Sequence, residues 1–320
     1  MTIASHALSP SAAVDAPGGA AAATRPGRVV VGIATTGRPD IVPGTILALG
    51  HQTRLPDLVV VSVAEEGDIA AGALPDLPFP FDRATGPKGL TRQRNRILER
   101  LRPDDLLLLI DDDFLLAPDF LERMVALFAA RPDIVMLTGT VLADGILGPG
   151  YGHDEGARLL SDGLARPAED RLTDVFNGYG CNFAMRARPV TAHGLRFDEA
   201  LPLYGWLEDM DFSRQLAPHG RIVRAGTLRG VHLGTKTGRS PGRRLGYSQV
   251  ANPIYLLGKG TTSVYEGIGI MLRNLAANMV RAVRPQPWTD HRGRLRGNLD
   301  ALVDLLRGRL HPMRALDLPG

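Results

Sequence analysis

The 320-residue chain contains little cysteine, lysine or aromatic residue, and it has no long apolar run. Its single cysteine, Cys181, excludes an internal disulfide framework and a zinc site that needs several cysteines. Aromatic residues make up only 5% of the chain, which argues against a surface that binds single-stranded nucleic acid by base stacking. No apolar run reaches the roughly 18 residues that a membrane span needs. With 44% hydrophobic and 22% charged residues, the chain has a globular composition, and we expect no nucleic-acid partner.

Positive charge is slight overall and comes almost entirely from arginine. The formal net charge is +3, and Lys88, Lys236 and Lys259 are the only lysines. The planar guanidinium fork of arginine suits phosphate binding, although an arginine-rich genome would give the same composition. Residues 1–27 are rich in Ala, Ser and Gly and lack the basic start and apolar stretch of a signal peptide. We predict a disordered tail there and a cytoplasmic protein.

Strand-like and helix-like segments alternate from residue 28 to residue 139. Short apolar runs, many of them β-branched, predict buried strands at 29–33, 58–63, 106–110 and 134–139, with helices at 41–51, 91–101 and 118–130. This alternation is typical of a parallel sheet covered by helices. Ligands bind such sheets at the carboxyl ends of the strands, so polar residues that follow a strand are candidates for a site.

The second half of the chain is less regular. We expect a mobile loop at 145–174, strands at 181–186 and ending near 233, a helix at 208–216 and an arginine-rich loop at 234–244. Residues 264–283 predict an amphipathic helix, and a further basic helix is expected at 292–310. On the first of these helices one face carries Ile268, Met271, Leu272, Leu275, Met279 and Val283, with Arg273, Arg281 and Arg284 opposite.

Three adjacent carboxylates, Asp111 to Asp113, end the third predicted strand. In extended chain Asp111 and Asp113 point the same way, so their charges repel unless a cation lies between them. Carboxylate oxygens suit Mg²⁺ or Mn²⁺, and such an ion could hold a diphosphate. A solvated acidic turn before the next helix is the alternative.

A second acidic pair, Glu208 and Asp209, opens a predicted helix. The helix dipole favours acids there, either for helix stability alone or to keep a general base ionised. Trp206, just before the pair, could stack on a sugar ring or pack in the core.

A third group of polar residues surrounds the end of the last predicted strand. His232 ends this strand and is either a ligand or a structural residue. The loop after it carries Lys236, Arg239, Arg243 and Arg244, which could neutralise a leaving diphosphate or remain solvated.

Two weaker signals lie nearer the N-terminus. The segment 86–95 joins a turn to a helix start, where backbone N–H groups and arginines can bind an anion. Glu65 follows the second predicted strand, where a carboxylate could accept a hydrogen bond from a base or ribose.

Taken in order, five segments resemble those of family 2 glycosyltransferases, which adopt the GT-A fold. The segments are 35–39, 89–95, 109–113 with 118–119, 180–186 with 196–199, and 208–216. The resemblance covers about residues 28–258 and implies an α/β domain with a mostly parallel sheet flanked by helices. We expect residues 259–320 to form a basic helical C-terminal extension. One departure is Glu65-Glu66, because the family usually has two aspartates there.

The resemblance implies an inverting transfer from a nucleotide-diphosphate sugar to the hydroxyl of a glycan or lipid-linked acceptor, in synthesis of a bacterial surface polysaccharide or glycolipid. It implies Mn²⁺ or Mg²⁺ bound by Asp111, Asp113 and His232, and Asp209 as the base beside Glu208. The implied acceptor residues are Trp206 and Asn182. The implied donor residues are Thr35, Thr36, Arg38, Glu65, Lys88, Arg92, Asn95, Asp111, Asp112, Lys236 and Arg239. Because the segment typical of processive members is missing, we expect addition of a single sugar.

Two other function classes remain open on the sequence alone. A nucleotidyltransferase that makes a nucleotide sugar would also use acids, a metal and a parallel sheet, but no Gly-rich phosphate loop follows the first strand. A non-catalytic binding module of the same fold is the second alternative. The basic extension could lie on the inner face of an anionic membrane, or it could pack its apolar face on the catalytic domain.

Overall fold

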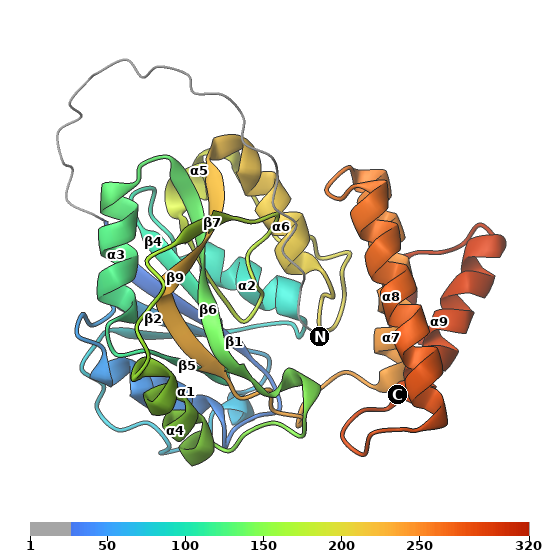
Figure 1. The fold of residues 1–320 in the computed structure, drawn as a ribbon, viewed down its shortest axis with the longest axis horizontal. Helices are drawn as coiled ribbons and strands as arrows, with labels where there is room; N and C mark the ends of the chain where they lie inside the picture. Colours follow the sequence, from blue (N-terminus) through green and yellow to red (C-terminus); the bar gives the residue numbers. More distant parts are fainter. Residues whose placement is uncertain (1–26, 320) are drawn as a thin grey trace.

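A large twisted sheet flanked by helices forms one part of the protein, and three helices, α7 to α9, form a second part beside it (Figure 1). The computed structural model describes residues 27–319. The predicted tail therefore lies outside the described residues, except for Gly27. No helix between residues 27 and 319 is long and apolar enough to cross a membrane.

Nine strands make the sheet, in the order β3-β2-β1-β4-β8-β6-β9-β5, with β7 also paired to β9. The strands are β1 (Val29–Thr35), β2 (Leu58–Val63), β3 (Phe81–Thr85), β4 (Leu106–Asp111), β5 (Phe114–Leu116), β6 (Ile134–Asp144), β7 (Leu172–Asp174), β8 (Asn182–Arg186) and β9 (Arg221–His232). The helices are α1 (Val42–Ala48), α2 (Leu90–Leu98), α3 (Phe120–Ala130), α4 (His153–Leu164), α5 (Ala187–His193), α6 (Glu208–Leu216), α7 (Gly242–Lys259), α8 (Val264–Val283) and α9 (His291–Leu306).

Strand direction decides where the site lies. The first four strands in the sheet are mutually parallel, and β8 runs antiparallel to both β4 and β6. Strand β6 therefore points the same way as β4, and β9 pairs parallel with β6. As a result β1, β2, β4, β6 and β9 end on one side of the sheet, which we call the carboxyl edge.

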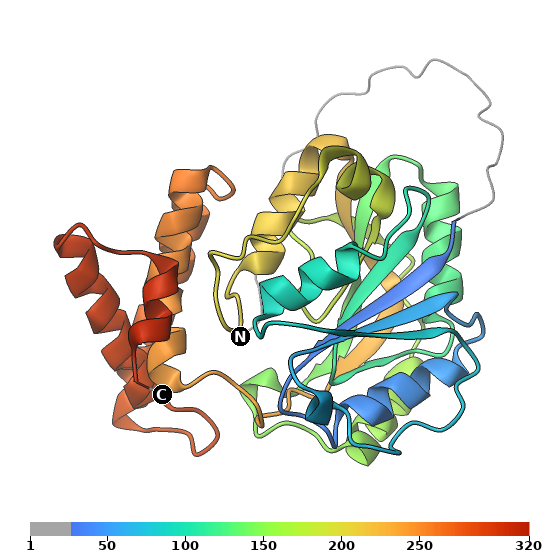
Figure 2. The ribbon, with the colours of Figure 1, turned by 180° about the vertical axis from the view of Figure 1, so that it is seen from behind.

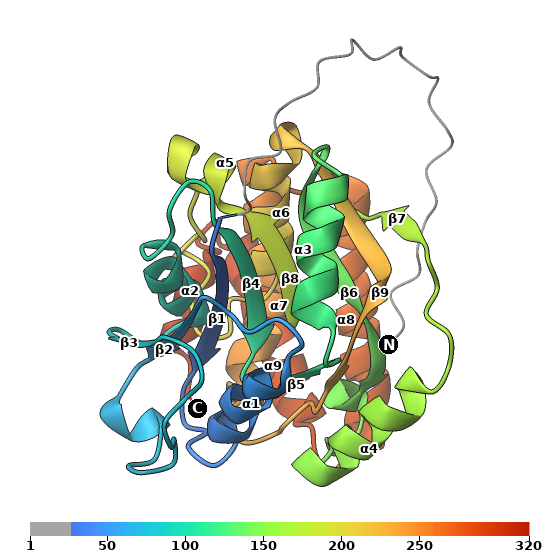
Figure 3. The same ribbon diagram turned by 90° about the vertical axis from the view of Figure 1, so that its left-hand side faces the viewer.

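Apolar layers cover both faces of the sheet. Alternate residues of β1 pack to opposite sides, Val29, Val31 and Ile33 on one and Val30 on the other, as expected for a buried parallel strand. Helices α1 and α3 cover the first face, and α2, α5 and α6 cover the second (Figure 3). The predicted α/β architecture is confirmed.

Three helices, α4, α5 and α7, were missed from the sequence. Helix α4 lies within the segment predicted to be a mobile loop, and its Leu159 and Leu160 pack beside β9. Helix α7 carries Pro253 and several glycines, which usually interrupt helices. The glycines permit close packing instead, because a Cβ at Gly246 would overlap the backbone of Arg294 on α9.

Helix α7 also corrects the prediction of an arginine-rich loop at 234–244, because the helix begins at Gly242. Arg243 and Arg244 lie on α7 and face the C-terminal segment rather than a diphosphate. The Arg243 guanidinium pairs with Asp300 at 2.7 Å, and Arg244 donates to the carbonyl oxygen of Leu318 at 2.9 Å.

Helices α7, α8 and α9 pack on one another and form a separate unit, seen on the left in Figure 2. Its small core gathers around Tyr247, Val250 and Ala251 of α7 and Ala301 of α9. Helix α8 spans the predicted residues, and its main contacts are with α7 and α9. Six of its large apolar side chains are exposed.

Candidate functional site

Asp111, Asp113 and His232 come together at the carboxyl edge. Asp111 ends β4, and the short strand β5 then turns back to pair with β9, so that Phe114 lies opposite His232. One ligand atom from each of the three residues lies within 4.8 Å of the others. The Nε2 atom of His232 is 3.3 Å from Asp113 Oδ1 and 3.8 Å from Asp111 Oδ2. The topology thus gathers the predicted metal ligands from two distant parts of the chain.

The donor set fits a divalent cation. Among the described residues, Asp113 Oδ1 is buried and makes no well-aligned hydrogen bond, although His232 Nε2 lies 3.3 Å away, so this oxygen is free to coordinate a cation. His232 Nδ1 lies 2.8 Å from Asp144 Oδ1, which turns Nε2 toward the two aspartates. Burial alone would lower the pKa of His232, but the carboxylates of Asp113 and Asp144 outweigh it and raise the pKa to about 10. With a proton or a cation, the cluster can balance its negative charge.

Asp112 points away from the other two aspartates. Its Oδ2 accepts a hydrogen bond from Thr35 at 2.6 Å and its Oδ1 accepts one from Arg38 Nη1 at 2.6 Å. Burial raises its pKa to about 6, against the opposing effect of Arg38. The same guanidinium lies 3.8 Å from Asp113 Oδ2. Asp112 therefore fastens the β1–α1 loop, and Arg38 becomes a fixed positive charge beside the metal cluster.

The loop after β9 closes over the same edge. The backbone N–H of Thr235 donates to Asp113 Oδ2 at 2.7 Å, and Arg38 Nε donates to the carbonyl oxygen of Thr237 at 2.8 Å. Lys236 Nζ donates to the carbonyl oxygens that follow β6, and burial lowers its pKa to about 8. Arg239 Nε donates to the carbonyl oxygen of Thr235. Lys236 and Arg239 thus lie in the loop beside the carboxyl edge.

Arg94 links this edge to helix α6, and the sequence analysis did not select it as a site residue. The side chain is 2% exposed. Its Nη1 donates to Glu208 Oε1 at 2.6 Å, and its Nη2 donates to the carbonyl oxygen of Gly180 at 2.7 Å and lies 3.3 Å from Asp111 Oδ1. The available signal in the sequence was the position of Arg94 itself, within the predicted anion-binding segment 86–95.

Asp209 and Glu208 differ in exposure and partners. Asp209 is partly exposed, and its Oδ2 accepts a hydrogen bond from the backbone N–H of Gly180 at 2.9 Å. Burial raises its pKa, while hydrogen bonds from the backbone N–H groups of Met210 and Gly180 act in the opposite direction. Glu208 is buried and turned toward Arg94. The prediction of a catalytic Glu208 is corrected: this carboxylate orients Arg94, and Asp209 is the acid open to an incoming group.

Two predicted asparagines are used inside the fold. Asn95 donates to the carbonyl oxygen of Phe197 at 2.9 Å and accepts from its backbone N–H at 2.9 Å, which pins that segment to α2. Asn182 is fully buried, and its Oδ1 accepts from the backbone N–H of Gly139 at 2.6 Å. Both amides satisfy buried backbone groups, so the structure corrects the donor role predicted for Asn95 and the acceptor role predicted for Asn182.

Three other predicted donor residues lie at the protein surface. Lys88 and Glu65 are exposed, and Arg92 is 3.4 Å from Glu199 on the surface of α2. The buried carboxylate after β2 is Asp68, which the sequence analysis missed because it follows the strand by five residues. Its Oδ1 accepts from the backbone N–H of Gly37 at 2.6 Å, and its Oδ2 accepts from the N–H groups of residues 64 and 65.

Thr36 and Trp206 are both partly exposed. Thr36 lies in the β1–α1 loop between Thr35 and Arg38. The indole Nε1 of Trp206 is buried and has no hydrogen-bond partner among the described residues, while its carbonyl oxygen accepts from Asn252 of α7 at 2.8 Å. Both therefore remain available to a ligand.

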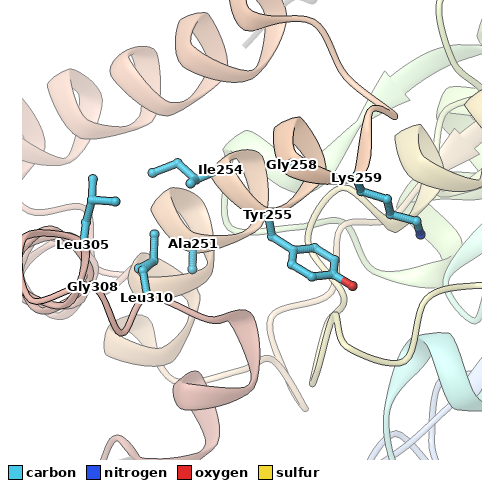
Figure 4. Close-up of a pocket in the computed structure, with 8 residues that line it drawn as sticks. All are labelled: Ala251, Ile254, Tyr255, Gly258, Lys259, Leu305, Gly308 and Leu310. Atoms are coloured by element: carbon cyan, nitrogen blue, oxygen red, sulfur yellow. The ribbon is translucent and has the colours of Figure 1, made fainter.

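A hollow of about 560 Å³ lies away from this site, on the helical unit. It is lined by Ala251, Ile254, Tyr255, Gly258, Lys259, Leu305, Gly308 and Leu310 (Figure 4). The polar ends of Tyr255 and Lys259 point to the opposite side from Ile254 (Figure 4). Both bind Asp198, at 2.9 and 2.8 Å, and Lys259 also binds Asp211 at 2.8 Å. These bonds join α7 to the sheet-containing part.

Comparisons with known proteins agree with this fold. The model of glycosyl transferase family 2 matches residues 31–192. No curated protein gives a significant match. The structure of the mannosyltransferase PcManGT from Pyrobaculum calidifontis in complex with GDP-Man and Mn²⁺ is similar, with a TM-score of 0.50 and 14% identity, over 88% of this chain and 81% of that chain. S. aureus TarS matches with a TM-score of 0.47 and 13% identity, over 72% of this chain.

The matched part of the chain spans only 40% of the length of TarS, and 65% of TarS 1–349. The likeness to PcManGT supports the GT-A fold, with its sheet and flanking helices. Because the family match covers half of the sequence, the chain belongs to glycosyl transferase family 2.

Proposed function

We propose that this chain is a metal-dependent inverting glycosyltransferase that transfers one sugar from a nucleotide-diphosphate sugar to an acceptor hydroxyl. The observation that carries the proposal is the placement of two acidic groups on either side of Arg94. The cluster of Asp111, Asp113 and His232 lies on one side, and the partly exposed Asp209 lies near the other. A leaving group and an attacking hydroxyl need such a pair of groups at two separate places in one site.

Asp111, Asp113 and His232 would hold the cation, and Mn²⁺ is the first candidate because PcManGT is in complex with Mn²⁺ and GDP-Man. When bound, such an ion supplies positive charge that stabilises a diphosphate leaving group. Arg38, Lys236 and Arg239 add fixed positive charge at the same edge. Asp144 orients His232 through Nδ1, so it is a positioning residue for the cluster.

The nucleotide would lie on the β1–α1 loop, with Thr35, Thr36 and Arg38. Asp68 holds this loop through the backbone N–H of Gly37, which gives the loop a fixed shape. Both carboxylate oxygens of Asp68 accept hydrogen bonds from backbone N–H groups. Asp68 would therefore position the loop, and other atoms would contact the base.

Asp209 would remove the proton of the acceptor hydroxyl as the oxygen attacks the anomeric carbon. The carbon–oxygen bond to the diphosphate breaks in the same displacement, so the configuration inverts. Asp209 is in the first turn of α6, where the helix dipole favours the ionised carboxylate and opposes the effect of burial. Trp206 would offer an aromatic face to the acceptor, a glycan or lipid-linked molecule used in surface polysaccharide or glycolipid synthesis.

A first experiment measures thermal shifts with a panel of nucleoside diphosphates and nucleotide sugars, each with and without Mn²⁺ or Mg²⁺. A ligand that binds the folded state raises Tm by mass action. We expect one base series to stabilise the protein in the presence of metal, and Asp113→Ala to remove the effect. Asp76→Ala, which changes an exposed aspartate of a loop, is the matched control.

Transfer or donor hydrolysis is then measured with the donor found. We expect Asp209→Asn to abolish turnover and keep nucleotide binding. Retained turnover in this variant would overturn the role of Asp209. Pyrophosphate release from a nucleoside triphosphate would favour the nucleotidyltransferase alternative, and binding without turnover of any donor would favour the binding module.

A further inference from the structure

Helix α8 exposes an apolar face along most of its length. Its six exposed large apolar residues, each between 52% and 78% exposed, are Val264, Tyr265, Leu272, Met279, Val280 and Val283. At 100° per residue these side chains share one side of the helix with the partly exposed Ile268 and Leu275, over an arc of about 160° that contains no charged residue. We call this surface the α8 face.

The inner side of α8 combines small and polar residues with one apolar contact, Met271, which packs against the core of the helical unit. Its only buried residues are Gly267 and Asn278. The amide of Asn278 donates to Gln249 Oε1 on α7 at 2.8 Å and to Asn298 Oδ1 on α9 at 2.9 Å. A helix packed on a core has the opposite arrangement, with apolar residues inward and polar residues outward. The polar bonds fix the rotation of α8, and this rotation directs the apolar residues away from the rest of the protein.

Charge around the α8 face is positive. From Gly242 to the end, the chain has twelve basic and five acidic residues, a net charge of +7, whereas the whole chain carries +3. On α8 itself, Arg273 is exposed and lies beside the apolar arc, and Arg284 is exposed just after the helix. An apolar strip beside arginines complements a surface that has both acyl chains and phosphate groups.

We propose that the α8 face docks on an anionic phospholipid bilayer, with its apolar side chains among the acyl chains and its arginines at the lipid phosphates. A second copy of the chain would cover the apolar strip, but its α8 would offer one acidic residue, Glu266, to three arginines, Arg273, Arg281 and Arg284, so charge complementarity favours the bilayer. The surface lies on the helical unit, apart from the carboxyl edge, and docking does not depend on the proposed transfer reaction.

The test is flotation of the full chain with vesicles of phosphatidylcholine, alone or with phosphatidylglycerol. We expect binding to the anionic vesicles and weaker binding as salt is raised. Leu272→Asp with Met279→Asp should weaken binding by about tenfold per site, because each change removes an apolar side chain from the acyl region. Arg273→Glu should weaken it by about fivefold or more on anionic vesicles alone. Leu55→Asp, an exposed leucine outside the helical unit, is the matched control.

All variants are checked for Tm and for nucleotide-induced stabilisation, so loss of vesicle binding is distinguished from loss of fold or of the donor site. Vesicle binding that vanishes in the α8 double variant and persists in Leu55→Asp supports the proposal. Absence of vesicle binding overturns it. A dimer in solution that Leu272→Asp converts to a monomer, without vesicle binding, would assign the α8 face to a second copy instead.

Discussion

Replacing Arg94 with methionine should strongly destabilise the protein, because this one guanidinium satisfies acceptors from three elements. Arg94→Met keeps an unbranched apolar side chain but removes the guanidinium, including its contact with the rings of Phe183 and Phe197, whose centroids lie 5.3 and 5.6 Å from the guanidinium carbon. It also removes the hydrogen bonds to Glu208 and to the carbonyl oxygen of Gly180 and the charge beside Asp111. The change therefore tests the guanidinium as a whole.

The size of the stability loss follows from the Glu208 carboxylate that is left without its partner. Glu208 is buried, and its Oε2 has no hydrogen-bond partner among the described residues even with Arg94 present. Removing one partner of a buried ion pair costs about 3–5 kcal/mol, because the other charge stays desolvated. For a domain of this size that corresponds to a decrease in Tm of about 10 °C.

The same ion pair predicts that the stability lost in Arg94→Met depends on pH. Burial raises the pKa of Glu208, and Arg94 is the main opposing influence, so in Arg94→Met the raised pKa should rise further. A carboxyl whose folded pKa lies above its unfolded value of about 4.3 adds stability at low pH and loses it as the pH rises through the folded pKa. Arg94→Met should therefore lose less stability relative to wild type at pH 5 than at pH 8.

The assay is urea unfolding at pH 5 and pH 8 for the wild type, Arg94→Met, Glu208→Gln and the double variant. We expect the double variant to recover about 1–3 kcal/mol of the sum of the single losses, since the two side chains are in direct contact. Arg94→Met within 1 kcal/mol of wild type at pH 8, or additive single changes, would refute the picture of Arg94 as a buried ionic link.

Three further changes test other contacts. Asp68→Ala should weaken nucleotide binding by about tenfold, measured by isothermal titration, and lower the stability by about 1–3 kcal/mol, because it frees the backbone N–H of Gly37 and of residues 64 and 65. Asn182→Ala should lower stability by about 1–3 kcal/mol in urea unfolding and leave the acceptor KM unchanged, because its amide bonds the interior of the sheet. Lys259→Met should leave Asp211 buried without its cation and increase proteolysis between β9 and α7, read by limited trypsin digestion.

Strands β1, β2, β4 and β6 were predictable because buried parallel strands appear in sequence as continuous apolar runs, whereas β3, β5 and β7 were missed. Residues 106–110 and 58–63 matched β4 and β2 almost to the residue. Helices α4 and α7 were not predictable by the same means. Their glycines, among them Gly246 and Gly156, look like helix breakers locally, and only the packed neighbour shows why a side chain is not tolerated there.

The cluster of Asp111, Asp113 and His232 was predictable from strand ends, and the residues packed around it were not. Asp111 and His232 end strands that point the same way, so the fold class alone brings them to one edge. Asn182 and Glu208 stand in equally suggestive segments, but their polar atoms face inward. A polar residue near a motif can bind a ligand or satisfy a buried group, and the sequence does not distinguish these roles until its partner is known.

Helix α8 is a further case in which the sequence pattern did not predict which side chains the fold buries. The periodicity predicted its length and an apolar stripe, yet it could not say which side of the helix the protein would bury. The predicted stripe is in fact divided: Met271 turns into the helical core, whereas Leu272 and Met279 are exposed. The rotation of α8 about its axis is set by Asn278, whose side chain makes two hydrogen bonds, one to α7 and one to α9. These bonds outweigh the burial of more apolar residues. A contiguous exposed apolar face of this length is rare in monomeric proteins without an interaction that uses it, which is why we assign the α8 face a partner.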